Sequence, residues 1–218
     1  MNVDPDGTDF WDYLITAAVI LVAVAAIVAV TIATAGIGTA VAGALGGGML
    51  GGIVGGAVGG AVTGALTGAI AGAGISLISQ GLSSGYENVS WSEVSVGALQ
   101  GGVSGAISGA VFGAVFGAAK VISAAKAWHT GASGSSYKNM MSHFVSHGKN
   151  MGFKTAVQYT NAAKVVIKNG TYLSSKNAFV TLARTGKYNF VGVIRGGNKI
   201  TTYSFRTFTK AAAALLDL

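Results

Sequence analysis

The chain has 218 residues and no cysteine, which excludes disulfide bonds, thiolate metal sites and a cysteine nucleophile. Its 14 Lys and Arg against 7 Asp and Glu give a formal net charge of +7, but the two signs are separated along the chain. Residues 1–119 carry −6 and residues 120–218 carry +13. A part that basic suits nucleic acid or an anionic membrane surface, and it also attracts an acidic protein partner. The change near residue 120 therefore predicts two parts with different roles.

The first residues predict a turn, then a membrane-interface cluster and a long apolar helix. Asp4-Pro5-Asp6-Gly7 contains the only proline and is typical of a turn. The segment up to Asp12 holds four aspartates and no Lys or Arg, unlike the basic start of a signal peptide. Phe10, Trp11 and Tyr13 are aromatic residues of the kind enriched at membrane interfaces. The apolar run from Leu14 to Ala35 exceeds the roughly 18 residues that indicate a transmembrane helix.

Glycine recurs every fourth residue along two stretches of the next segment. The two ladders are Gly48, Gly52, Gly56, Gly60, Gly64, Gly68 and Gly72, and then Gly97, Gly101, Gly105, Gly109, Gly113 and Gly117. Residues i and i+4 share a helix face, so each ladder forms a smooth groove that lets another helix approach closely. Glycine costs a helix about 1 kcal/mol relative to alanine, so a compensating contact is required. The polar stretch from Ser79 to Ser92 predicts the turn of a crossed helical hairpin.

Two environments are compatible with such a hairpin. Val, Ile and Leu are abundant and glycine has no three-residue period, which argues against a collagen-like or disordered segment. No residue from Tyr13 to Tyr86 or from Val94 to Ala119 is charged. Insertion in a membrane is therefore favoured over a soluble glycine-rich bundle. Residues 13–126 are predicted to form the membrane-inserting region, with contact to lipid over residues 13–119.

The remaining residues predict a small soluble domain of the α+β class. Residues 127–136, which include Gly131-Ala132-Ser133-Gly134-Ser135-Ser136, are expected to be a linker before a domain at 137–218. Helices are expected at Tyr137–His147, Thr155–Lys168 and Thr207–Leu216, and strands at Asn177–Thr185, Tyr188–Arg195 and Lys199–Arg206. The second helix would bury Ala156, Tyr159, Ala163, Val166 and Ile167, and Gly186-Lys187 and Gly196-Gly197-Asn198 would form hairpin turns. The predicted fold is α+β, with glycine-zipper hydrophobic helices followed by a helix–helix–antiparallel-sheet domain.

Acidic residues are nearly absent from the basic part, and this narrows its chemistry. After Glu93 the only carboxylate side chain is that of Asp217. Paired-carboxylate glycosidases, two-metal nucleases, Ser-His-Asp hydrolases and zinc deaminases need acids or cysteines that residues 120–216 lack. The residue types that remain can cleave RNA without a metal or another cofactor. The ribose 2′-OH attacks the phosphodiester while one group removes its proton and another protonates the leaving 5′-oxygen, so DNA would be spared.

His143 and His147 are the first candidates for this chemistry. Their i, i+4 spacing puts both on one helix face, with Lys149 just beyond. One interpretation is an acid/base histidine beside a phosphate-binding cation, and the other is two solvated helix histidines. A metal site is the poorer interpretation, because it needs a further ligand and only His129 is available, across the linker.

The second group of candidates lies on the predicted strands. Strict alternation along the last strand predicts two faces, one with Ile200, Thr202 and Ser204 and the other with Thr201, Tyr203 and Phe205. With Arg184 and Arg195 on neighbouring strands, one sheet face would present hydroxyl and guanidinium groups to a phosphate. The alternative is that these are ordinary surface arginines of a basic domain.

Two parts of the chain resemble known families. Val3-Asp4-Pro5-Asp6-Gly7 resembles the DPxG-type junction that ends the core of Rhs/YD-repeat polymorphic toxins, after which the variable toxin begins. Ser142-His143-Phe144-Val145-Ser146-His147-Gly148 with Gly152-Phe153, and later Lys199-Ile200-Thr201-Thr202-Tyr203, are similar to signatures of small toxin RNases. Those RNases belong to the barnase–EndoU–colicin–RelE superfold, which includes colicin D-like anticodon nucleases. The chain departs from the colicin D-like pattern because Lys149 is the only lysine close to the histidine.

The resemblance implies an RNA target such as tRNA, a cognate immunity protein of acidic character, and an upstream Rhs shell with a chaperone. It also implies that His143, with Thr202 or Tyr203, lies near the scissile phosphate. The expected catalytic residues are His143, His147, Arg184, Thr202 and Tyr203. The expected substrate-binding residues are Lys149, Lys154, Arg195 and Lys199.

The leading hypothesis is a secreted antibacterial toxin that is delivered into the cytoplasm of a target cell. Residues 1–12 would be the junction after an upstream core, residues 13–126 would aid membrane passage, and residues 137–218 would cleave RNA. The main alternative is non-enzymatic: the glycine hairpin permeabilises the membrane and the basic domain docks on anionic lipid. A third interpretation is a chaperoned structural segment with no toxicity of its own.

Overall fold

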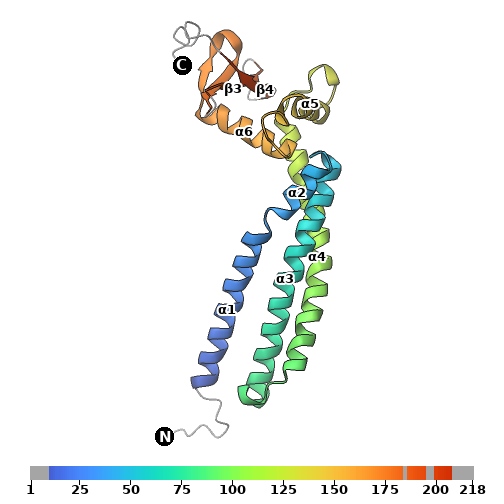
Figure 1. Ribbon diagram of the computed structural model, residues 1–218, viewed down its shortest axis with the longest axis vertical. Coiled ribbons are helices and arrows are strands. Elements are labelled where there is room, and N and C mark those ends of the chain that lie inside the picture. Colours follow the sequence, from blue (N-terminus) through green and yellow to red (C-terminus); the bar gives the residue numbers. More distant parts are fainter. Residues whose placement is uncertain (1–9, 184–185, 195–198, 208–218) are drawn as a thin grey trace. The chain divides into compact units, whose positions relative to one another are not determined.

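The computed structural model describes residues 10–183, 186–194 and 199–207, and it confirms the α+β class (Figure 1). The described chain divides into two compact units. The apolar unit comprises residues 10–38 and 54–115, and the basic unit comprises the described residues of 39–53 and 116–207. The predicted junction at residues 1–12 lies mostly outside the described residues, as does most of the last predicted helix.

The apolar unit is built from long helices. They are α1 (Phe10–Thr34), α3 (Met49–Ser84) and α4 (Trp91–Lys126), and α3 and α4 also contribute residues to the basic unit. A 3-10 turn at Tyr86–Asn88 joins α3 to α4, so the connection is shorter than the polar stretch Ser79–Ser92 had indicated. By length and composition, three helical segments are able to cross a membrane: Trp11–Ala44, Met49–Ser84 and Trp91–Lys126.

Within the apolar unit, the glycines of α3 face those of α4. A Cβ atom added at Gly64 would overlap the carbonyl oxygen of Gly105, and it would lie 2.8 Å from that carbonyl carbon and 3.2 Å from the Cα of Gly109. Equivalent contacts recur along the pair, between Gly60 and Gly109, Gly68 and Gly101, and Gly72 and Gly97. The two backbones therefore touch along a seam that no larger residue could occupy without separating the helices.

Helix α1 lies along α3 in the same unit, and hydroxyl pairs connect it to the hairpin (Figure 1). Thr16 and Tyr86 share a hydrogen bond of 2.5 Å between their hydroxyl oxygens. Thr34 and Thr63 share another, of 2.6 Å. These bonds satisfy polar groups that would otherwise face only apolar side chains.

The basic unit combines short helices with an antiparallel sheet. Its helices are α2 (Ile37–Ala44, shared with the apolar unit), α5 (Ser136–His143), a π-helical turn (Phe144–Gly148) and α6 (Ala156–Asn169). The strands are β1 (Thr171–Leu173), β2 (Ala178–Leu182), β3 (Tyr188–Val193) and β4 (Ile200–Arg206), paired in the order β1-β2-β3-β4. The two predicted helices at 137–168 and the three predicted strands are confirmed. The three-residue strand β1 was not predicted.

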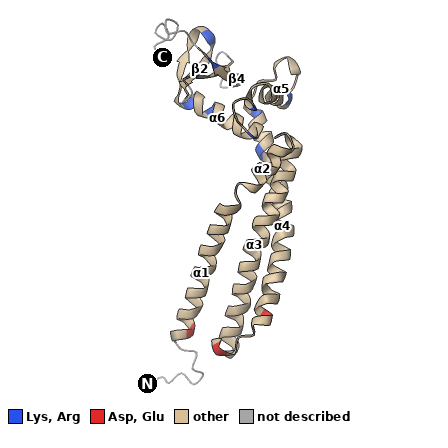
Figure 2. Cartoon of the chain, viewed as in Figure 1, with Lys and Arg blue, Asp and Glu red and all other residues tan. Residues whose placement is uncertain are grey.

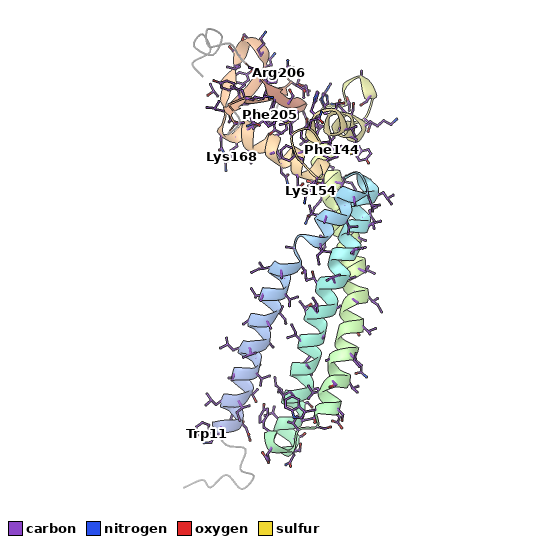
Figure 3. All side chains as sticks on the ribbon, viewed as in Figure 1. Trp11, Phe144, Lys154, Lys168, Phe205 and Arg206 are labelled. Atoms are coloured by element: carbon purple, nitrogen blue, oxygen red, sulfur yellow. The ribbon has the colours of Figure 1, made fainter. Side chains whose placement is uncertain are left out.

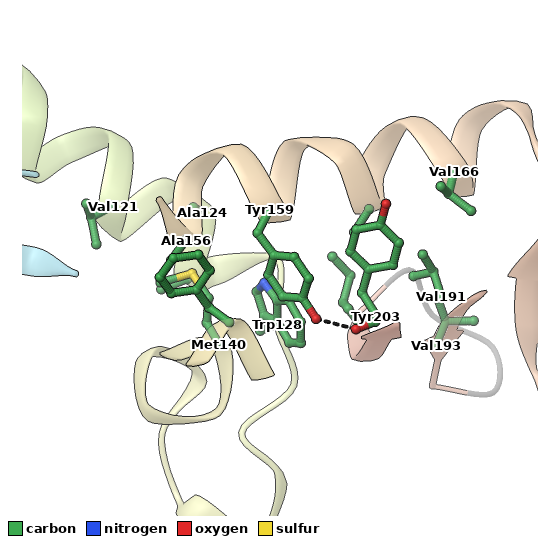
Figure 4. Packing of buried hydrophobic residues seen from close by; sticks show 14 residues of the cluster. Val121, Ala124, Trp128, Met140, Ala156, Tyr159, Val166, Val191, Val193 and Tyr203 are labelled. Carbon is green, nitrogen blue, oxygen red and sulfur yellow. Dashed lines mark hydrogen bonds between the residues drawn. The ribbon is translucent and has the colours of Figure 1, made fainter. Parts of the chain in front are cut away.

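Aromatic side chains form the core of the basic unit (Figure 4). Trp128, Phe144 and Tyr159 are fully buried, and the Tyr159 hydroxyl donates a hydrogen bond to the Tyr203 carbonyl. The core face expected on α6 is present, because Ala156, Tyr159, Ala163 and Val166 are buried and Ile167 packs against them. Periodicity was sufficient to find this face because α6 is amphipathic over its whole length.

The expected linker at residues 127–136 differs from the structure at its first residues. Trp128 lies in the centre of the core, and the last residues of α4, including Val121 and Ala124, are buried with it. The flanking backbone pairs with the start of β4: the His129 N–H donates to the Ile200 carbonyl and the Ile200 N–H donates to the Ala127 carbonyl, both at 2.9 Å. Residues 121–129 are therefore part of the basic unit.

The corner between α2 and α3 also belongs to the basic unit, although the sequence placed it in the membrane region. The Ala156 N–H donates to the Gly47 carbonyl at 3.2 Å, and the Met49 N–H donates to the Tyr137 hydroxyl at 3.0 Å. Gly47 has a φ of 70° and approaches the backbone of Lys154 and Thr155 so closely that a Cβ atom would lie 2.9 Å from both. Glycine suits both demands, since it accepts positive φ and has no side chain.

Candidate active site

The structure brings together His143 and Thr202, two candidate residues from different elements of the basic unit. His143 is the last residue of α5, and Thr202 lies on β4. The Thr202 Oγ1 lies 3.4 Å from the His143 Nδ1, although 59 residues separate them in the chain. This is a long hydrogen bond, of the kind that tightens when a substrate fills a site.

The ring of a buried tryptophan stacks on the His143 ring. The ring centroids of Trp128 and His143 are 5.4 Å apart with 24° between their planes. Trp128 is itself fixed, because its Nε1–H donates to the Thr160 Oγ1 at 2.9 Å and its ring stacks on that of Tyr159. The imidazole therefore rests on a rigid aromatic support, with His147 at a ring-centroid distance of 5.7 Å on the same helical segment.

A β-bulge determines the direction of Thr202. Gly192 pairs with Thr202 and Val193 pairs with Ile200, so Thr201 is an extra residue on β4. The strict alternation expected along this strand is therefore wrong, since Ile200 and Tyr203 are both buried in the core. Bulges commonly re-aim side chains near functional sites.

The environment of His143 favours the neutral imidazole. Burial lowers the pKa of His143 below its ordinary value of 6.5, and the nearby positive charge of His147 lowers it further. A neutral imidazole is the form that accepts a proton. Because the unfolded chain binds this proton more readily, the stability contributed by the shift is present above pH 6.5 and is lost as pH falls through the lowered pKa.

Tyr203 does not share the His143 surface. Its ring is buried and stacks on Tyr159 at a centroid distance of 5.0 Å, and its hydroxyl donates to the Asn189 Oδ1 at 3.1 Å. Burial raises the pKa of Tyr203 to about 12, so the phenol stays protonated. Among the two hydroxyl candidates on β4, Thr202 is the one that the structure places against the histidine.

The predicted cations are dispersed. Lys149 is exposed two residues after His147, at the end of the π-helical turn. Lys154 is exposed, and its backbone packs on the corner at Gly43 and Gly47. The Lys199 Nζ donates to the Lys126 carbonyl at the end of α4, where a cation stabilises the helix dipole. Arg184 and Arg195 lie outside the described residues.

The His129 ring forms a hydrogen bond within its own loop. The Gly131 N–H donates to the His129 Nδ1 at 3.1 Å. Within the residues that the structure describes, no three His, Cys, Asp or Glu side chains gather as a metal site would require.

Two features of the site were missed in the sequence. Trp128 was assigned to a Gly/Ser-rich linker, but a large aromatic residue at the start of such a segment was a signal that the chain is anchored there. The basic unit also has an open groove of about 490 Å³, lined by Ala127, Lys164, Ile167, Lys168 and Phe179. Lys164 and Lys168 are four residues apart and share one face of α6, so the groove combines two cations with an apolar floor.

No protein-family model, curated protein or solved structure matches this chain.

Proposed function

We propose that the basic unit is an endoribonuclease that uses no metal, and that the apolar unit takes it to and through the membrane of a target cell. The observation that carries this proposal is the contact between His143 and Thr202. A neutral, partly buried imidazole beside a hydroxyl, in a unit of strongly positive charge, suits general-base attack on a phosphodiester.

The mechanism requires the His143 tautomer that carries its proton on Nδ1, because the Thr202 hydroxyl can either donate or accept. If its Nδ1–H donates to the Thr202 Oγ1, the lone pair on Nε2 is free to accept the proton of a ribose 2′-OH. The 2′-oxygen then bonds to phosphorus, the bond from phosphorus to the 5′-oxygen breaks, and the 5′-oxygen receives a proton from His147 in its charged form. The products carry a 2′,3′-cyclic phosphate and a free 5′-OH, and no oxidant or other reactant is consumed.

Positive charge supports binding of the substrate. All 14 Lys and Arg lie at Lys120 or later, and Figure 2 shows the described ones on the helices and strands of the basic unit. Lys149 lies close to the histidines in the chain, and Lys164 and Lys168 line the open groove of the basic unit. Because lysines that bind phosphates release counterions, the affinity for tRNA or another RNA should fall as salt rises.

The experiment is RNA cleavage by the purified full chain in excess EDTA, with tRNA as substrate. His143→Gln should abolish cleavage, Thr202→Val should reduce kcat, and Thr202→Ser should restore most of it because the hydroxyl is retained. His129→Gln is the matched control, because that ring lies in its own loop. Loss of one general base is worth roughly 10²–10⁴ in rate. Full activity of His143→Gln, or complete inhibition by EDTA, would refute the mechanism.

The positive charge of the basic unit also predicts the character of a protein that inhibits it. An acidic immunity protein would cover the His143 surface, and its association rate should fall steeply as salt rises. An upstream Rhs shell and a chaperone, implied by residues 3–7, belong to the same proposal. An association rate that is independent of salt would contradict an electrostatic interface.

A second candidate function is membrane permeabilisation without catalysis. It is favoured by the three helical segments of membrane-spanning length in the described chain. Dye release from lipid vesicles separates the two functions. If His143→Gln keeps both toxicity and dye release, the pore is sufficient, and if it loses toxicity while dye release is unchanged, the ribonuclease is required.

A further inference from the structure

The described acidic residues gather at one end of the apolar unit (Figure 2). Asp12 lies in the first turn of α1, Glu87 in the turn between α3 and α4, and Glu93 in the first turn of α4. The hydrogen bond between Thr16 and Tyr86 brings the start of α1 beside that turn. This end of the unit carries only negative charges among the described residues, and the first cation of the chain is Lys120, far along α4.

Exposed aromatic residues mark the same end. Trp11 is 66% exposed, Tyr13 is 70% exposed and Trp91 is 70% exposed, and Figure 3 labels Trp11 at the start of α1. Tryptophan and tyrosine are enriched where a membrane meets water, because their rings are amphipathic. An acidic, aromatic end is therefore suited to the headgroup region.

The outer faces of the helices are suited to acyl chains. On α4, a ridge of large apolar residues repeats every fourth position, each more than half exposed: Leu99, Val103, Ile107, Val111 and Val115. The glycine ladder of the same helix, offset by two residues, faces α3. Helix α4 thus uses its glycines against α3 and leaves its large residues for a surrounding apolar phase.

The length of the apolar stretch matches a bilayer. From the helical rise per residue, α4 extends about 43 Å between Trp91 and Lys120. The part of α3 in the apolar unit, residues 54–84, extends about 45 Å. A bilayer with its headgroup regions is about 40–45 Å thick. Its interfaces would therefore lie at Trp91 and at Lys120.

We propose that the apolar unit crosses the target bilayer in one fixed orientation and remains there, so that the basic unit acts while tethered to the cytoplasmic face. Asp12, Glu87 and Glu93 stay on the external side.

Three crossings, by α1, α3 and α4, put the start of α1 and the end of α4 on opposite sides. The cytoplasmic side retains Lys and Arg, and both its negative potential and its anionic lipids favour the basic end. Lipid acyl chains contact the outer apolar faces of the helices of the apolar unit. The inference rests on the membrane part of the proposed function and is independent of the RNA chemistry.

The chain has no native cysteine, so single cysteines report sidedness directly. The full chain carrying His143→Gln, which silences the proposed RNA cleavage, is made in bacteria with Ser83→Cys near the turn or Ser175→Cys in the basic unit. Both serines are exposed. A membrane-impermeant maleimide applied to intact cells with a permeabilised outer membrane should label Ser83→Cys at least tenfold more than Ser175→Cys, and lysis should make the two equal.

A charge variant tests the cause of the orientation. Replacing Glu87 and Glu93 with lysine should lower the labelling of Ser83→Cys, whereas glutamine at both positions should leave most of it. Labelling of Ser175→Cys in intact cells, or equal labelling of both positions, would overturn the proposal. Extraction of the protein by alkaline carbonate would mean that the membrane role itself fails. Retention in the membrane with reversed labelling would refute the orientation alone.

Discussion

The seam between α3 and α4 allows a quantitative test with a matched pair of substitutions. Gly64→Ala places a methyl group against the carbonyl of Gly105, and Gly74→Ala places one where its nearest neighbour outside the helix is the Ala23 Cβ at 3.8 Å. Both changes replace a helical glycine with alanine, which favours the helix by about 1 kcal/mol. The two variants therefore differ only in packing.

The size of the difference follows from the geometry. At Gly64 the new Cβ would lie 2.8 Å from a carbonyl carbon, well inside van der Waals contact, so the helices must move apart along several glycine pairs. Overpacking of this kind costs about 1–3 kcal/mol. Gly74→Ala meets only an ordinary contact and should stabilise the unit. The gap between the two variants should therefore be about 1–3 kcal/mol, with Gly64→Ala the less stable.

The assay is unfolding of the full chain in mixed micelles with rising SDS fraction, followed by protease resistance of the α3–α4 pair. The midpoint should fall for Gly64→Ala and rise or stay constant for Gly74→Ala. Equal midpoints would mean that the backbone contact between α3 and α4 does not stabilise the unit, and the reasoning about the seam would be refuted.

Other predictions concern the basic unit. Thr160→Val should lower the free energy of unfolding in urea by about 1 kcal/mol, because the hydrogen bond from Trp128 is lost. Trp128→Phe should lower it further, because buried ring volume is lost as well, and the double variant should cost less than the sum of the two. His147→Gln should raise the pKa of His143 toward, but not to, 6.5, since burial persists; NMR titration of the ring measures it. Lys199→Met should destabilise the last turn of α4, seen as faster amide exchange there, by about 0.3–1 kcal/mol. An unchanged free energy of unfolding for Thr160→Val would contradict the first prediction. An unchanged pKa of His143 in His147→Gln would contradict the second, and unchanged amide exchange in the last turn of α4 in Lys199→Met would contradict the third.

Periodic features could be predicted from the sequence. The core face of α6 and the three longer strands follow from spacing of apolar residues, and His143 and Thr202 were singled out by residue type and by resemblance. Their contact could not be derived, because it depends on the bulge at Thr201, which adds one residue without any proline or glycine at that position. The three-residue strand β1 is too short to show a pattern.

The boundary between the parts was harder to locate because charge and packing disagree. Charge changes at Lys120, and the Gly/Ser-rich stretch predicted a linker at 127–136 before the domain, yet Val121 and Trp128 are buried in the core of the basic unit. The corner at Gly47 contributes backbone hydrogen bonds to the same unit from within an apolar, glycine-rich stretch. Tertiary contacts of this kind leave no mark on local composition.

The end of α4 belongs both to a long apolar helix and to the packing around the candidate site. Val121 and Ala124 near the end of α4, and Trp128 just beyond it, are buried in the core of the basic unit, and the His143 ring stacks on Trp128. A shift of α4 along its axis by one turn, about 5.4 Å, would move Trp128 away from the His143 ring. The activity of the proposed ribonuclease would then depend on the position of α4 along its own axis.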